Sequence, residues 1–150
     1  MRRLAVLVAA IVLAVPAVAD AKQKRKIVKS SGTIQGHLAQ PATADGYAFA
    51  GFVSDSKLGE GATTSHGSFD GSTTSGTLTV FLDKGTLRAS FHFTTTPNAD
   101  GTVTFQGTTK YKGGTGAYKG AKGSGETTAT QDADGYTAFD YTQTLKLPKR

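Results

Sequence analysis

The sequence predicts an all-β fold whose antiparallel strands form a barrel or a sandwich, with little or no helix after a short leader. The chain has 150 residues, no cysteine and 19 glycines, and it is rich in threonine, a bias toward turns and strands. The residues after position 31 show no sustained 3.6-residue spacing of an amphipathic helix. Short alternating segments separated by Gly, Asp and Asn indicate about eight strands joined by near-neighbour turns.

Residues 1–19 have the layout of a secretory signal peptide. Arg2 and Arg3 precede an apolar run over 4–15, and small residues follow it. The run is shorter than the roughly 20 residues that a membrane-spanning helix needs, so an exported protein is favoured over a retained signal anchor. Cleavage can follow Ala19 or Ala21, with Ala19 preferred, and the alanine- and valine-rich style is typical of bacteria. We expect a secreted protein.

The net charge of +6 comes mainly from the two ends of the chain. A basic arm over 20–30, expected to be disordered, carries Lys22, Lys24, Arg25 and Lys26. Between residues 45 and 140 acidic residues outnumber basic ones, and the barrel domain, 31–147, lacks a basic patch interleaved with stacking aromatics. We therefore expect no nucleic-acid partner, and we place any contact with an anionic surface on the arm.

The strand pattern is clearest in the second half of the chain. Strands are expected over 32–38, 46–54, 58–69, 76–82, 86–95, 102–111, 123–131 and 136–147, with the Gln40-Pro41 region as a loop. In 86–95, Phe91 and Phe93 alternate with polar residues, so one face is apolar. Turn residues over 97–101 and 132–135 join neighbouring strands as hairpins.

A glycine-rich stretch runs from Gly113 to Gly123 with the sequence Gly-Gly-Thr-Gly-Ala-Tyr-Lys-Gly-Ala-Lys-Gly. It is not a phosphate loop, because that motif needs Gly-Lys-Ser/Thr at the start of a helix. Tight turns with positive φ are the better interpretation, so the stretch is expected to be a structural corner with Tyr118 folded inward as a plug. The glycines of this turn motif are Gly113, Gly114, Gly116, Gly120 and Gly123.

The same stretch resembles the signature of the allene oxide cyclase and dirigent barrel superfamily. That resemblance implies an eight-stranded antiparallel β-barrel in which the glycine-rich segment leads into the last hairpin. Plant members steer radical coupling or cyclise an unstable fatty-acid epoxide, and small secreted bacterial proteins of unassigned role carry the same signature. The resemblance implies neither the plant proteins' catalytic residues nor their assembly for this chain.

Few ionisable residues could support catalysis. His37, His66 and His92 lie on separate expected strands without metal-ligand spacing, so no metal or cofactor is expected. Arg88 and His92 share the polar face of 86–95, which is a solvated outer face if the phenylalanines fill the barrel. Asp140 would act as a general acid only if it faced an apolar lumen, and alternation turns it away from its aromatic neighbours. No serine is placed as a hydrolase nucleophile, so a non-enzymatic protein is favoured, and an isomerase or cyclase stays open as the enzymatic alternative.

Three functions follow as hypotheses. The first is a lumen that binds a small apolar or amphipathic molecule. The second is guidance of a reactive intermediate by an isomerase or cyclase of the allene oxide cyclase kind, and the third is a non-catalytic surface-interaction protein with a solid core. The candidate lumen residues are the aromatic side chains Phe91, Phe93, Phe105, Tyr111, Tyr118, Phe139 and Tyr141.

Overall fold

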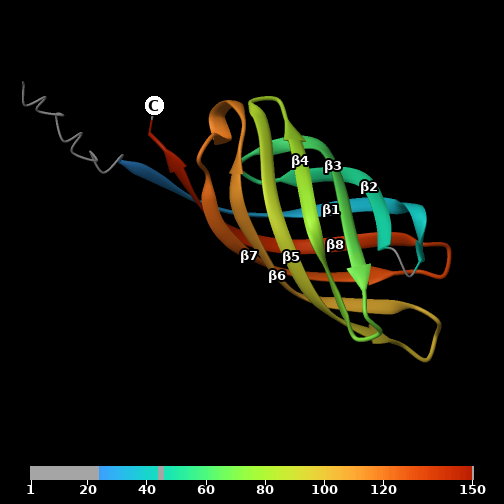
Figure 1. Ribbon diagram of the computed structural model, residues 1–150. Coiled ribbons are helices and arrows are strands. Elements are labelled where there is room, and N and C mark those ends of the chain that lie inside the picture. Colours follow the sequence, from blue (N-terminus) through green and yellow to red (C-terminus); the bar gives the residue numbers. More distant parts are fainter. Residues whose placement is uncertain (1–23, 44–45, 150) are drawn as a thin grey trace, which may run out of the picture.

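A computed structural model describes residues 24–43 and 46–149, which form eight β-strands and one short 3-10 helix (Figure 1). The strands are β1 (Arg25–Thr43), β2 (Gly46–Asp55), β3 (Gly59–Phe69), β4 (Thr73–Leu82), β5 (Gly85–Pro97), β6 (Val103–Gly114), β7 (Lys122–Gln131) and β8 (Tyr136–Pro148). The helix η1 (Gly116–Tyr118) lies in the connection between β6 and β7. Within the described residues there is no apolar helix of membrane-spanning length.

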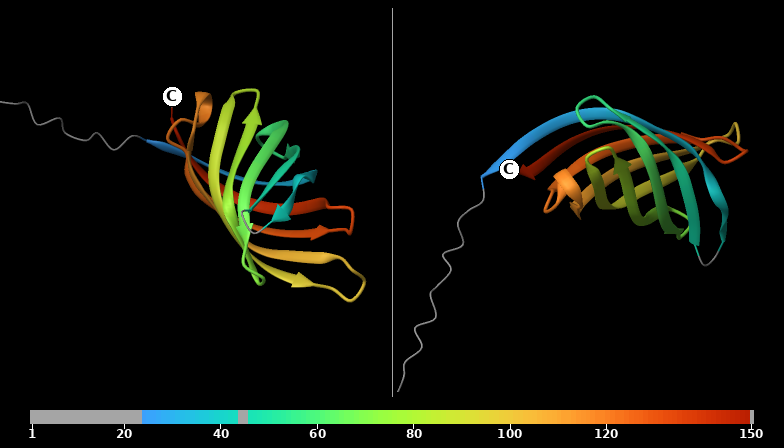
Figure 2. Two further views of the ribbon diagram at one scale, coloured as in Figure 1. Left: turned by 45° about the vertical axis from the view of Figure 1, so that its right-hand side comes forward. Right: turned by 90° about the horizontal axis from the view of Figure 1, so that it is seen from above.

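The strands follow one another around a closed barrel in sequence order, and every neighbouring pair is antiparallel (Figures 1 and 2). The barrel closes where β1 pairs with β8, in a register that runs from Arg25 opposite Pro148 to His37 opposite Tyr136. Closure satisfies the backbone groups that an open sheet would leave unpaired at its edges. The expected eight-stranded antiparallel β-barrel is therefore confirmed.

The first strand is longer than expected. The sequence suggested a disordered arm over 20–30, but β1 begins at Arg25 and pairs with the end of β8. The Arg25 guanidinium also donates a hydrogen bond of 3.1 Å to the carbonyl of Gly120. Ordering of this basic segment is possible because the C-terminal strand supplies backbone partners, which composition does not show. The predicted signal peptide lies outside the described residues.

The expected loop around Gln40-Pro41 is also wrong, since β1 continues to Thr43. The register between β1 and β2 shifts after Leu38 and again after Gln40. Beyond His37, β1 has no partner in β8. Proline is tolerated at such an irregular strand end with a single neighbour, because no ladder hydrogen bond is required of its nitrogen.

The barrel has two different ends. The closed end carries the turns over 56–58 and 83–84 and the β6–β7 connection over 115–121, and the open end carries the turns over 70–72, 98–102 and 132–135. Toward the closed end the interior is packed. The buried residues of this core are Val53, Val80, Leu82, Leu87, Ala89, Tyr111, Tyr118, Ala121 and Leu145.

The glycine-rich connection covers the closed end. Gly116 has a φ of 55°, which favours glycine, and a side chain there would strike the backbone carbonyl of Lys84. The same carbonyl accepts a hydrogen bond of 2.7 Å from the amide of Ala117. This close approach brings η1 over the barrel end, where the Tyr118 side chain is buried with 3% of its surface exposed. Gly113, Gly120 and Gly123 also have positive φ, and Gly114 does not.

Candidate functional site

A cavity of about 310 Å³ occupies the lumen between the packed core and the open end. Phe69 and Pro97, which are exposed at the open end, belong to its lining, so the cavity reaches solvent there. Its lining is mainly apolar. Its aromatic and polar lining residues include Tyr47, Phe49, Asp55, Ser65, Phe91, Phe93, Phe105, Tyr111, Gln131, Thr137, Phe139, Tyr141 and Gln143.

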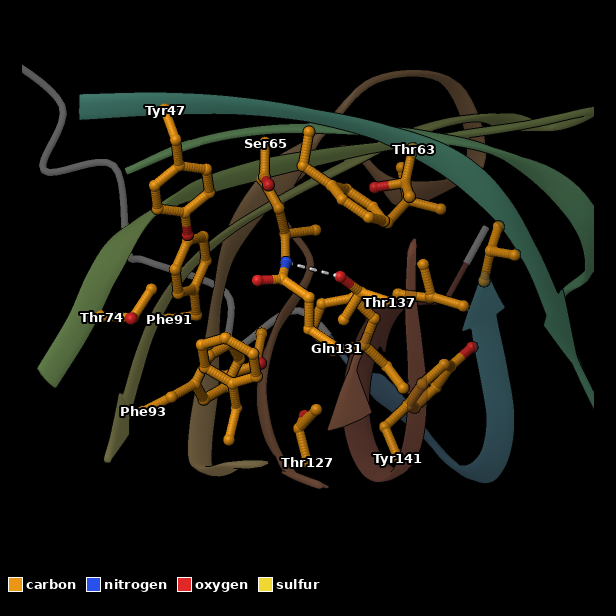
Figure 3. Close-up of a pocket in the computed structure, with 18 of the residues that line it drawn as sticks. Tyr47, Thr63, Ser65, Thr74, Phe91, Phe93, Thr127, Gln131, Thr137 and Tyr141 are labelled. Carbon is orange, nitrogen blue, oxygen red and sulfur yellow. Dashed lines mark hydrogen bonds between the residues drawn. The ribbon is translucent and has the colours of Figure 1, made fainter. Parts of the chain in front are cut away.

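Phenylalanine rings form one wall of the cavity (Figure 3). Phe91 and Phe93 stack with ring centroids 5.0 Å apart, and Phe139 lies 6.4 Å from Phe93 and 5.5 Å from Phe49. Gly76 pairs with Phe91 across the sheet, and a side chain there would strike the Phe91 ring. Glycine on the neighbouring strand thus leaves the ring room to lie over the backbone. The wall is a preformed apolar surface.

Most of the sequence-predicted lumen residues line this cavity. Phe91, Phe93, Phe105, Tyr111, Phe139 and Tyr141 belong to its lining. Tyr118 does not, because the β6–β7 connection buries it in the core cluster at the closed end. Its side chain therefore closes the barrel and is not placed to contact a molecule in the cavity.

A carboxylate lies at the inner end of the cavity, where sequence reasoning did not place one. Asp55 is 6% exposed, and its Oδ2 accepts hydrogen bonds from the Ser30 hydroxyl at 2.9 Å, the Tyr141 hydroxyl at 2.9 Å and the Gln143 amide nitrogen at 2.7 Å. Its Oδ1 accepts from the backbone amides of Lys57 at 2.8 Å and Leu58 at 2.9 Å. A carboxylate offers about four lone-pair positions, so these five donors use its whole acceptor capacity.

The signal for Asp55 was present in the alternation of β2. Asp55 is six residues after Phe49 and two after Val53, so all three point to the same face. The strand ends there because the carboxylate binds the amides of the following turn, as Asp often does. Gln143 is likewise in step with Phe139 and Tyr141 on β8.

The Gln143 amide has a fixed orientation. Its nitrogen donates to Ser30 and to Asp55, and only the nitrogen can face an acceptor-only carboxylate. The carbonyl oxygen Oε1 is then buried without a hydrogen-bond partner among the described residues. Burial, followed by the Asp55 charge and hydrogen bond, raises the pKa of Tyr141 far above its ordinary value. Burial and the Asp55 charge also raise the pKa of Tyr111.

A second group of polar side chains lies nearer the open end. Gln131 donates a hydrogen bond of 2.9 Å to the Thr137 hydroxyl, and its amide oxygen has no partner among the described residues (Figure 3). The Tyr47 side chain points into the same space. Burial raises the pKa of Tyr47 to about 12, so the phenol is neutral at physiological pH. These groups can exchange hydrogen bonds with a molecule in the cavity without contributing charge.

The histidines and the other polar candidates lie on the outer surface. His37, His66 and His92 are exposed on β1, β3 and β5, as are Arg88 and Asp140. None of the five lines the cavity. In the part of the chain that the structure describes, no three His, Asp or Glu side chains are grouped as metal ligands.

No family model matches the chain, and no curated protein matches it. Among solved structures the chain is similar to that of a pterocarpan synthase dirigent protein. The two share 11% sequence identity with a TM-score of 0.41, over 85% of this chain and 88% of the other. The likeness is one of fold.

Proposed function

We propose that this is an exported binding protein whose lumen holds a small, uncharged, mostly apolar molecule. The observation that carries the proposal is the cavity of about 310 Å³ between the phenylalanine wall and the Asp55 network. Protein pockets that bind small molecules usually have volumes of about 300–1,000 Å³. This cavity is at the lower end of that range, so its occupant is small.

The charges of the lining favour an uncharged occupant. Asp55 is the one acidic lining residue, and no lysine, arginine or histidine of the described chain belongs to the lining. An anion would therefore lose its hydration without gaining a cationic partner. A cation would have to compete with the five donors that already satisfy the Asp55 carboxylate.

The polar side chains of the lining would orient the occupant. The hydroxyl groups of Tyr47 and Tyr111 and the amide oxygen of Gln131 have no hydrogen-bond partner among the described residues. Each hydroxyl can donate, and the amide oxygen can only accept. A molecule with an apolar body and a hydroxyl, amide or carbonyl group fits this arrangement.

Binding is favoured over catalysis by the state of Asp55. A general base must have a free acceptor site within reach of the substrate's proton. The five donors of the protein use the acceptor capacity of Asp55, and three of them come from side chains that hold β1, β2 and β8 together. The carboxylate is therefore built into the structure, and guidance of a reactive intermediate by acid–base chemistry has less support than binding.

The test uses two fluorophores that share one aromatic frame and differ by a charge. We expect the uncharged N-phenylnaphthylamine to bind at least ten times more tightly than anilinonaphthalene sulfonate, since a lost ion–water interaction is not replaced in the lumen. Equal affinity for the two would contradict an uncharged site. Native mass spectrometry of the protein from its own host is expected to show an extra mass of a small molecule, which would identify the natural occupant.

Two matched variants locate the site. Ser65 lines the cavity from β3, whereas Thr64 beside it is exposed on the outer wall. Ser65→Phe is expected to fill the cavity and to abolish binding of N-phenylnaphthylamine, and Thr64→Phe to leave it unchanged. Far-ultraviolet circular dichroism verifies that both variants fold. Unchanged binding in a folded Ser65→Phe variant would remove the lumen as the site.

A further inference from the structure

Positive charge is concentrated at one end of the barrel, where basic residues far outnumber the exposed acidic residues Glu60 and Asp83. Every described lysine and arginine is exposed and lies in the half that includes the closed end. These residues are Lys24, Arg25, Lys26, Lys29, Lys57, Lys84, Arg88, Lys110, Lys112, Lys119, Lys122, Lys146 and Lys149. They come from the starts of odd-numbered strands, the ends of even-numbered strands and the turns between them, so they surround the closed end.

The open end has the opposite charge. Its turns carry Asp70, Asp100, Asp132 and Asp134, all exposed, and no described basic residue. Hydrogen bonds from Thr73 and Ser72 lower the pKa of Asp70, and hydrogen bonds from Thr102 lower the pKa of Asp100. Both carboxylates are therefore ionised at neutral pH. The barrel is therefore an electric dipole whose cavity opens at the negative end.

Some of the positive charges are placed where they destabilise the barrel. Lys122 and Lys146 are directly opposite each other on β7 and β8, and both are exposed. Like charges at opposed positions of an antiparallel pair are destabilising. A residue pattern that breaks a local rule without an internal gain points to a partner outside the chain.

Exposed apolar side chains accompany the positive charges. Ile27 is 60% exposed beside Lys26 and opposite Lys146, where β1 and β8 extend past the rest of the barrel (Figures 1 and 2). Phe52 and Phe81, both exposed, flank Ala62 on the outer wall of the same half. Basic residues combined with exposed apolar ones are the composition that binds a lipid–water interface.

We propose that the closed end docks on an anionic lipid bilayer and that the cavity then opens away from the membrane. A bilayer is flat and negatively charged, so it can meet basic residues all around one end of a barrel at once. A linear polyanion such as a nucleic acid would contact only part of that ring.

The test is sedimentation of the full chain with vesicles, where pure phosphatidylcholine is the reference and phosphatidylglycerol supplies the negative charge. The reference measures any binding by the apolar residues 4–15. Each lysine near an anionic bilayer strengthens binding about fivefold. The triple variant Lys119→Gln, Lys122→Gln, Lys146→Gln is therefore expected to bind anionic vesicles about a hundredfold more weakly than the natural chain. Added salt is expected to weaken the binding of the natural chain to these vesicles.

A matched control separates position from net charge. Ser68→Glu, Thr94→Glu and Thr130→Glu change the net charge by the same amount at exposed sites in the half that includes the open end. We expect this control to bind anionic vesicles within about threefold of the natural chain, because its charges lie more than a Debye length from the membrane. Equal weakening of both triple variants would overturn docking by the closed end, as would equal binding of the natural chain to neutral vesicles.

Orientation can be read from tryptophan reporters, since the chain has no tryptophan of its own. Ile27→Trp places the reporter at the closed end and Phe69→Trp at the open end. With brominated lipids in anionic vesicles we expect quenching of the first and not of the second, and the reverse would overturn the proposal. Both triple variants are expected to bind N-phenylnaphthylamine normally, so failure of membrane docking and failure of lumen binding are distinguishable.

Discussion

Substitution of Asp55 measures how strongly one carboxylate holds the inner end of the cavity together. In Asp55→Ala, the Ser30 hydroxyl, the Tyr141 hydroxyl and the Gln143 amide nitrogen lose their common acceptor. A buried donor left without an acceptor costs about 1–3 kcal/mol. Water can replace the acceptor for the two partly buried turn amides, so the three side chains dominate and the expected loss is about 3–9 kcal/mol. Domain stabilities are about 5–15 kcal/mol, so this loss is a large fraction of the total.

Asp55→Asn provides the graded comparison. Its amide oxygen can keep the two turn amides, and the hydroxyl groups of Ser30 and Tyr141 can rotate to accept from the new amino group. Only the Gln143 amino group would face another donor, which predicts a loss of about 1–3 kcal/mol. The exposed Asp83 has no hydrogen bond within the described chain, so Asp83→Asn should stay within about 0.5 kcal/mol of the natural protein.

Urea unfolding followed by far-ultraviolet circular dichroism measures these free energies, because the signal reports the strands. The expected order of stability is natural chain and Asp83→Asn, then Asp55→Asn, then Asp55→Ala. An Asp55→Asn variant as stable as the Asp83→Asn control would refute the network as a stabilising element. Tyr141→Phe in a double-mutant cycle with Asp55→Asn should show a coupling energy of about 0.5–3 kcal/mol, as contacting residues do.

Two further predictions concern the lining and the core. Burial raises the pKa of Tyr47 from 10.0 to about 12, so the fold favours the neutral phenol. The stability gained from the neutral Tyr47 phenol is complete below about pH 10 and is lost as the pH rises through about 12. In a phenolate absorbance titration, the Tyr47→Phe variant should lack the ionisation step that the natural chain shows near pH 12. A titration curve unchanged by the substitution would contradict the raised pKa. Leu145 is 0% exposed, so Leu145→Ala should cost about 2–5 kcal/mol in urea unfolding. Ile27→Ala, at a side chain 60% exposed, should cost less than about 1 kcal/mol, and equal losses would show that β8 is not packed as described.

The barrel could be predicted from the sequence because its strands alternate and its turns are short. The segment around Phe91 and Phe93 shows the clearest alternation, and both rings face the lumen. The start of β1 could not be predicted, since a charged segment becomes a strand only when another strand is beside it. Tyr118 lies outside the strands, where alternation gives no direction. The glycine-rich turn motif predicted that it folds inward as a plug, and it is buried at the closed end, whereas its expected place in the cavity lining was wrong.

The polar part of the site was missed for a different reason. Asp55 and Gln143 are in phase with apolar neighbours, but polar residues were expected to face solvent. A buried polar residue can be recognised in a sequence only when its hydrogen-bond partners are recognised with it. One partner of Asp55 and Gln143 is Ser30, which comes from the segment that was expected to be disordered. The charge dipole could have been inferred from the sequence, because strand direction alone assigns each lysine to one end of an up-and-down barrel.

Closure between the first and last strands also has a consequence for the order of folding. Seven of the eight pairings join strands that are consecutive in the chain, and such hairpins form quickly. The remaining pairing brings together residues far apart in the sequence, such as Ser30 and Gln143, which are separated by 113 positions. Asp55 binds side chains from both sides of that seam, so the network forms only once the seam closes. The step that completes the barrel, slow because of its long loop, also completes the inner end of the cavity.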